Sequence, residues 1–131
     1  MRPATNIHTK DNILKISEAS INISNLRLRT YIGFNPEEKA KQQDVIVNVQ
    51  ICYQADLAFV SDNEDDALNY KTITKSMISH IEDGRFHLLE KLAADLLAIA
   101  TESKQVTFAE VKAFVDERLP ADFKSIYQPA F

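Results

Sequence analysis

The chain of 131 residues has few of the residue types that several common functional motifs require. With only two glycines, it cannot form a glycine-rich phosphate-binding loop or a dinucleotide fingerprint. Its single cysteine, Cys52, and its three histidines lack the spacing of a zinc site. No G-x-S-x-G turn of a serine hydrolase is present either. What remains is the chemistry of carboxylate, tyrosine and lysine side chains, without a metal.

Neither charge nor hydropathy indicates a polymer or a membrane as partner. The formal net charge is −4 and the basic residues do not cluster, which disfavours nucleic acid. No run is long and apolar enough to cross a membrane, and the polar first residues lack the core of a signal peptide. A lone cysteine forms no intramolecular disulfide, so a cytoplasmic location is expected. We expect Cys52 itself to be a small buried hydrophobe.

The composition that is present is typical of one globular domain. Hydrophobic residues make up 45% and charged residues 26% of the chain. We expect residues 1–20 to form a polar arm and residues 21–131 to form the domain, with 116–131 as an atypical C-terminal segment.

Two long segments alternate between apolar and polar residues, which predicts strands. In the first, the alternation of residues 21–23 slips by one position at Asn25 before it resumes at 26–28, which indicates a bulge or bend. The second segment, residues 44–53, alternates without a break. The polar residues 33–43 between them are expected to be a connection. The two strands are therefore predicted to form an antiparallel pair.

Helical spacing follows, first from about Tyr70 and then, after an interruption at Gly84, to about Glu102. Residues 106–115 alternate again as a strand, and the weak pattern after them leaves a short fourth strand open. The order predicts an α+β fold, with an antiparallel sheet and two helices on one face. So small a sheet has exposed edges, and pairing between subunits would cover them.

One acidic residue, Glu90, stands where the second helix should be apolar, with Phe86, Ala93 and Leu97 at helical spacing. A carboxylate in the first turn of a helix is stabilised by free backbone N–H groups, which is one interpretation. The other is a ligand with two parallel N–H donors, such as the amino-pyrimidinone edge of a pterin or guanine. Such a ligand would offset the cost of an apolar setting.

Four segments together resemble the dihydroneopterin aldolase family: "NLRLRTYIGFNPEEK", "QQDVIVNVQICY", "DALNYKTITKSM" and "RFHLLEKLAADLL". They lie in the family's order between about Ile21 and Val115, and are most similar to its dihydroneopterin triphosphate 2′-epimerase branch. The resemblance implies the tunnelling fold (T-fold), in which subunits join edge to edge into a ring-shaped barrel. The resemblance further implies that two tetrameric rings stack into a homo-octamer, with active sites between subunits that need no metal or cofactor.

The resemblance also implies roles for particular residues. Glu90 matches the glutamate that anchors the pterin, and Leu89 matches the neighbour whose backbone touches the ring. Tyr70 matches a tyrosine from the adjacent subunit, and Glu38 an acidic residue near the dihydroxylated tail. Glu38 and Tyr70 are the catalytic candidates. A triphosphate tail would need cations, for which there are four candidates that are otherwise ordinary surface charges: Arg27, Arg29, Lys71 and Lys75.

The implied reaction is epimerisation at C2′ of 7,8-dihydroneopterin triphosphate, giving dihydromonapterin triphosphate by retro-aldol and aldol steps. Two alternatives stay open: a dihydroneopterin aldolase of folate biosynthesis, and a non-catalytic oligomer that binds a pterin or purine. The family's catalytic lysine is not matched, because its place falls at Val115, Asp116 or Glu117. The regular final strand of the family is also not evident in the sequence.

Overall fold

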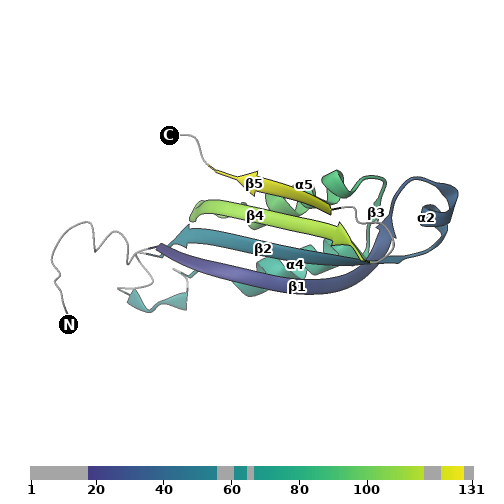
Figure 1. Ribbon diagram of the computed structural model, residues 1–131. Helices are drawn as coiled ribbons and strands as arrows, with labels where there is room; N and C mark the ends of the chain where they lie inside the picture. The colour runs from purple at the N-terminus through teal and green to yellow at the C-terminus, as the bar shows by residue number, and fades with distance from the viewer. Residues whose placement is uncertain (1–17, 56–60, 65–66, 117–121, 129–131) are drawn as a thin grey trace.

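The computed structural model describes residues 18–55, 61–64, 67–116 and 122–128. It contains one five-stranded sheet of order β3-β1-β2-β4-β5, which is antiparallel except where β3 runs parallel to β1 (Figure 1). The elements follow the chain as β1 Glu18–Ile32, α2 Pro36–Ala40, β2 Gln43–Gln54, α4 Tyr70–Glu82, β3 Arg85–Phe86, α5 Leu89–Ala100, β4 Val106–Val115 and β5 Asp122–Tyr127. The fold is α+β, as the order of predicted elements indicated.

The first two strands pair as predicted, and the bulge lies at the predicted position. The register of β1 with β2 shifts between Ile23 and Leu26. Asn25 has a φ of 55°, and its backbone N–H donates to Asn48 Oδ1 at 2.8 Å. The shift lets the apolar residues on both sides of the bulge face the same way, toward the buried alternate residues of β2.

Helices α4 and α5 lie against one face of the sheet and supply much of the core (Figure 1). Met77 and Ile81 of α4, and Leu92 and Leu96 of α5, are fully buried. They meet the inward-facing residues of β2 and β4, of which Val45 and Val111 are fully buried. None of the helices among the described residues is long and apolar enough to cross a membrane.

Several sequence expectations need correction. The short helix α2 lies inside the segment expected to be only a connection, and the two-residue strand β3 was not predicted. The sheet begins already at Glu18, within the predicted arm, and residues 1–17 lie outside the described part. Cys52 is only half-buried, because it faces the side of the sheet that the helices do not cover. A final strand does exist: β5 is short, as left open, and pairs with β4 along its length.

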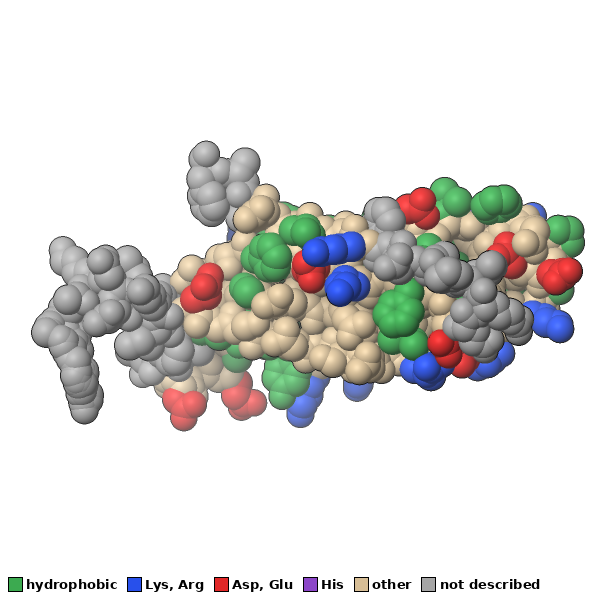
Figure 2. All heavy atoms as spheres, in the orientation of Figure 1, with side chains coloured by type: hydrophobic (Ala, Val, Ile, Leu, Met, Phe, Trp, Pro, Cys, Tyr) green, Lys and Arg blue, Asp and Glu red, His purple; other side chains and the backbone are tan. Residues whose placement is uncertain are grey.

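The face of the sheet opposite the helices carries hydrophobic side chains, such as the exposed Ile126, together with charged side chains of both signs. Figure 2 shows this face, with Lys and Arg side chains lying beside Asp and Glu side chains. Lys124 Nζ, for example, lies 3.0 Å from Glu110 Oε2 of the adjacent strand. We call this surface the open face.

Candidate functional site

Three of the four predicted site residues lie at the same end of the molecule. Glu38 belongs to α2, and Leu89 and Glu90 begin α5. The two regions are joined through β3, because the Gly33 N–H donates to Phe86 O at 2.8 Å. Figure 1 shows α2 and β3 together beyond the end of β4. The fold therefore brings Glu38 toward the start of α5.

Glu38 already has local hydrogen-bond partners. Its Oε1 accepts from the backbone N–H groups of Phe34 and Asn35, at 3.1 and 3.2 Å, and Asn35 Oδ1 accepts from the Glu38 N–H at 2.9 Å. This reciprocal pattern is a capping box, which satisfies the free donors at a helix start. The half-buried Glu38 side chain also fills the space above Gly33, where φ is 117°. The carboxylate is held in place before any ligand is considered.

Glu90 has a different setting. It lies in the first turn of α5, whose N-cap residue Leu88 makes no side-chain capping bond. Leu89 is nearly buried with 8% of its surface exposed, whereas Glu90 is exposed within the single chain. The apolar setting expected from spacing is therefore incomplete: Ala93 beneath Glu90 is buried, but Ala94 is exposed. The part of the chain that the structure describes therefore leaves Glu90 accessible to a ligand or to another subunit.

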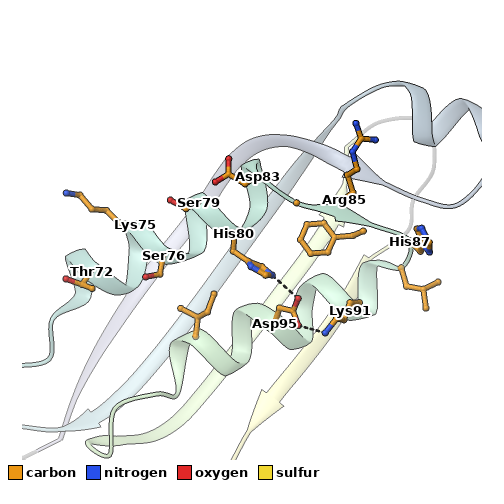
Figure 3. A pocket seen from close by; sticks show the side chains of 14 residues that line it. Thr72, Lys75, Ser76, Ser79, His80, Asp83, Arg85, His87, Lys91 and Asp95 are labelled. Carbon is orange, nitrogen blue, oxygen red and sulfur yellow. Dashed lines mark hydrogen bonds and ion pairs between the residues drawn. The ribbon is translucent and has the colours of Figure 1, made fainter.

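Tyr70 lies away from the other three. It begins α4, which has 13 residues and is therefore about 20 Å long at 1.5 Å per residue. The far end of α4 leads through β3 to Glu90, and the two helices run antiparallel (Figure 3). Tyr70 is 51% exposed. Within one chain, Tyr70 and Glu90 stand at opposite ends of the helical layer.

Glu38 borders a cleft of about 850 Å³ between α2 and the adjoining ends of β1, β2 and β4. Four charged residues form an ion-pair network here. Arg27 Nη1 lies 2.6 Å from Asp116 Oδ2 and 3.0 Å from Asp44 Oδ2, and Arg29 Nη1 lies 2.7 Å from Asp44 Oδ1. The hydrogen bond to Asp116 is the main cause that raises the pKa of the Arg27 guanidinium. Both arginines are thus neutralised by the fold itself.

A second cleft, of about 1110 Å³, runs between α4 and α5 and contains none of the four predicted site residues (Figure 3). Its floor holds an ion-pair cluster in which Asp95 lies 2.8 Å from both His80 Nε2 and Lys91 Nζ. Desolvation opposes ionisation of Asp95, but the hydrogen bonds from Lys91 and His80 outweigh it and lower the pKa of the carboxyl. His80 joins two helices and also packs against Phe86, with ring centroids 5.4 Å apart.

Sequence reasoning missed these two charge clusters. The Arg27, Arg29 and Asp44 contacts cross the first hairpin, and its register places Arg29 opposite Asp44. The Arg29–Asp44 contact could therefore have been predicted from the sequence once the bulge in the first strand had been located. The His80–Asp95 pair depends on how two helices pack, which the spacing of neither helix reveals. Among the described residues, no group of three or more His, Cys, Asp or Glu side chains could hold a metal ion.

Comparison with known proteins decides the family. A model of the dihydroneopterin aldolase family matches residues 21–127. The dihydroneopterin triphosphate 2′-epimerase of Escherichia coli K12 is 54% identical over 94 residues, which are 72% of this chain and 78% of that protein. The chain belongs to the dihydroneopterin aldolase family.

Other members of the dihydroneopterin aldolase family are more distant. The dihydroneopterin aldolase of Escherichia coli K12 is 30% identical over 74 residues, or 56% of this chain and 61% of that protein. The crystal structure of the Escherichia coli aldolase in complex with neopterin superposes with a TM-score of 0.68 at 20% identity. That superposition covers 82% of this chain and 98% of that chain. The predicted fold class, the tunnelling fold of this family, is thereby confirmed.

The expected position of the family's lysine contains no lysine in the described residues. Val115 ends β4, is half-buried and packs against the core. Asp116 is bound to Arg27, and Glu117 lies outside the described part. The nearest lysines on β4 and β5, Lys112 and Lys124, stand opposite each other on the open face. They point to the other side of the sheet from the residues that contact α5.

Proposed function

We propose that this protein is a dihydroneopterin triphosphate 2′-epimerase. One observation carries the proposal: identity to the Escherichia coli epimerase is 54% over 94 residues, against 30% over 74 residues for the aldolase of the same organism. The motif with Tyr70 and the segment with Glu90 both lie within the portion matched by the family model. The expected product is dihydromonapterin triphosphate, and the expected location is the cytoplasm.

The site we propose is shared between two subunits. Glu90 would bind the amino-pyrimidinone edge of the pterin through two charge-assisted hydrogen bonds, beside the backbone of Leu89. Tyr70 would come from the neighbouring subunit, because α4 separates it from Glu90 within one chain. Glu38 would lie near the dihydroxylated tail, in the cleft that it borders.

The proposed chemistry uses the substrate as its own electron acceptor. Removal of the proton from the 2′-hydroxyl lets the C1′–C2′ bond break, with its electron pair moving toward C6 and N5 as N5 gains a proton. The aldehyde fragment then turns over, and C1′ adds to its other face, which inverts C2′ and returns both protons. Holding the two fragments together would favour epimerisation over aldolase cleavage. Glu38 and Tyr70 are the residues we propose for proton transfer.

Assembly into a ring would complete this site. The outer edge of β1 pairs with β3 only at Tyr31 and Ile32, which leaves its other described residues without a strand partner on that side. At the opposite edge, β5 has β4 as its sheet neighbour. Edge-to-edge pairing of subunits would satisfy both edges. We propose the homo-octamer of two stacked tetrameric rings that the family resemblance implies.

A second candidate is a protein that binds pterin without converting it. The observation that favours it is Val115, an apolar residue packed against the core at one of the positions expected for the lysine. A site with Glu90 but without a proton donor near N5 would keep affinity and lose turnover.

The experiment is to incubate the purified protein with 7,8-dihydroneopterin triphosphate and to separate the products by chromatography that resolves the 2′ epimers. We expect the monapterin epimer to accumulate. Accumulation of 6-hydroxymethyl-7,8-dihydropterin instead would identify an aldolase. Unchanged substrate, with pterin binding verified by calorimetry, would favour the binding protein over the epimerase.

A further inference from the structure

The structure divides the four cations considered for the triphosphate into two pairs. Arg27 and Arg29 form ion pairs with Asp44 and Asp116, with N···O distances of 2.6 to 3.0 Å. Their charges are therefore balanced by carboxylates of the same chain. Lys71 and Lys75 of α4 are exposed, and the described residues offer neither of them an ion-pair partner within 4.0 Å. Lys75 lines the outer part of the cleft between α4 and α5, and in Figure 3 its side chain extends outward from α4.

The placement of these two lysines is unfavourable for the helix itself. They are four residues apart, so two like charges share one face of α4, which destabilises a helix. Lys71 also stands in the first turn, where the positive end of the helix dipole disfavours a cation and where α4 has no acidic residue. The chain is acidic in total, yet no Asp or Glu occurs from Tyr70 to Ile81.

Helix α5 shows the arrangement that α4 lacks. There Lys91 is followed four residues later by Asp95, and the two side chains lie 2.8 Å apart. An opposite pair of this kind stabilises a helix, and α5 gains a partner on α4 as well. Lys71 and Lys75 of α4 thus lack the pairing of opposite charges, four residues apart, that α5 has. Such departures are expected where a residue serves a ligand.

We propose that Lys71 and Lys75 hold the triphosphate of the substrate and set the preference for a phosphorylated pterin. This inference rests on the proposed function, in which Tyr70 lies beside the reacting side chain. Lys71 is the next residue after Tyr70, and Lys75 follows one turn later. A substrate tail that passes Tyr70 therefore meets both ammonium groups. A triphosphate neutralises both lysines at once, and each ammonium group donates charge-assisted hydrogen bonds to phosphate oxygens.

The test is the double variant Lys71→Gln/Lys75→Gln, which removes both charges and keeps good helix formers. We expect KM for dihydroneopterin triphosphate to rise about tenfold, because two exposed charge contacts to phosphate are lost. Kinetic constants for unphosphorylated dihydroneopterin should stay unchanged. Lys104→Gln, at an exposed lysine between α5 and β4, is the control for the loss of a positive charge outside α4. The variant Lys71→Arg/Lys75→Arg, which keeps both charges, should retain the preference for the triphosphate over unphosphorylated dihydroneopterin.

Binding of inorganic tripolyphosphate, measured by calorimetry at low ionic strength, separates this inference from the proposed function. Weaker binding in the double variant than in the wild type and in the Lys104→Gln control supports the lysine pair. Equal binding in all three would overturn it. Lysine-dependent binding of tripolyphosphate by a wild type that converts no pterin would leave the lysine pair supported and refute the epimerase.

Discussion

Glu38 and Glu90 are both predicted site residues and both lie in the first turn of a helix, but the fold treats them differently. Glu38 closes a capping box with Asn35 and fills the space over Gly33. Glu90 starts a helix that has no side-chain cap, and it is exposed. At the same end of one molecule, one carboxylate stabilises its own backbone, whereas the other has no structural partner that the described residues reveal.

The difference shows which glutamate is available for a ligand. Both backbone N–H bonds of Glu38 go to Oε1 and fix the orientation of its side chain, so only part of its acceptor capacity remains for a ligand. Glu90 keeps both oxygens free for a pair of donors. We therefore propose Glu90 before Glu38 as the binding residue, and Glu38 has a structural role whether or not it also serves catalysis.

The largest effect is expected from Glu90→Ala. Loss of two charge-assisted hydrogen bonds, each contributing about 1.5–3 kcal/mol, should weaken pterin binding more than 100-fold. The midpoint of thermal unfolding should stay near that of the wild type, because an exposed residue without a partner is removed. Calorimetry with neopterin and thermal unfolding measure the two quantities. Wild-type affinity in the variant would refute the role of Glu90.

Mixing subunits of two variants tests whether the site is shared between subunits. If Tyr70 and Glu90 of different subunits form one site, Tyr70→Phe and Glu90→Ala subunits that exchange into mixed oligomers should regain part of the wild-type turnover. Exchange is followed by mass spectrometry of the native oligomer. No recovery after complete exchange would argue for a site within one chain.

A smaller effect, and one on stability, is expected from Glu38→Ala. Loss of the capping box should lower the free energy of unfolding by about 1 kcal/mol. Glu38→Gln can still form the box and should lose little stability, so a fall in turnover of this variant would report a catalytic role. Urea unfolding gives the free energies, and Glu37→Ala, at an exposed residue of the same turn, is the control. Equal stability of Glu38→Ala and Glu37→Ala would contradict the structural role.

The smallest effect concerns Asp95, the second carboxylate of α5. Because Lys91 and His80 lower its pKa in the folded state, its ionisation stabilises the fold above the unfolded pKa and stops doing so as the pH falls through the folded pKa. Asp95→Asn should therefore cost about 0.5–1 kcal/mol at pH 7 and less at pH 3, which lies below the unfolded pKa. Urea unfolding at both pH values checks this. An equal loss of stability at both pH values would refute the pairing.

The long elements of the fold could be predicted from sequence because each has its own period. Strands β1, β2 and β4 and helices α4 and α5 each repeat their apolar residues over ten or more positions. Strand β3 could not be predicted, since two residues carry no period and its pairing with β1 depends on tertiary contacts. Helix α2 did leave a signal: Asn35 followed three residues later by Glu38 is a capping-box pattern.

The candidate site was predictable only as a set of residue types. Spacing marked Glu90 as unusual, but burial depends on what surrounds a helix, and within one chain Glu90 is exposed. The distance between Tyr70 and Glu90 follows from the antiparallel packing of two helices, which no local pattern reports. The separation of paired arginines from unpaired lysines likewise needed the register of the first hairpin.

The bulge at Asn25 has a consequence for how the protein can vary over evolution. Side chains alternate along a strand, so if both residues 24 and 25 stayed and the strand ran without a bulge, Leu26 and Leu28 would point to the opposite face from Ile21 and Ile23. Deletion of one of these two residues would instead give regular alternation, with both apolar halves on the same face and in the same register with β2. Relatives that lack one residue at this position should therefore have a regular β1 without the bulge, and a one-residue gap here should be tolerated better than a gap elsewhere in the strand.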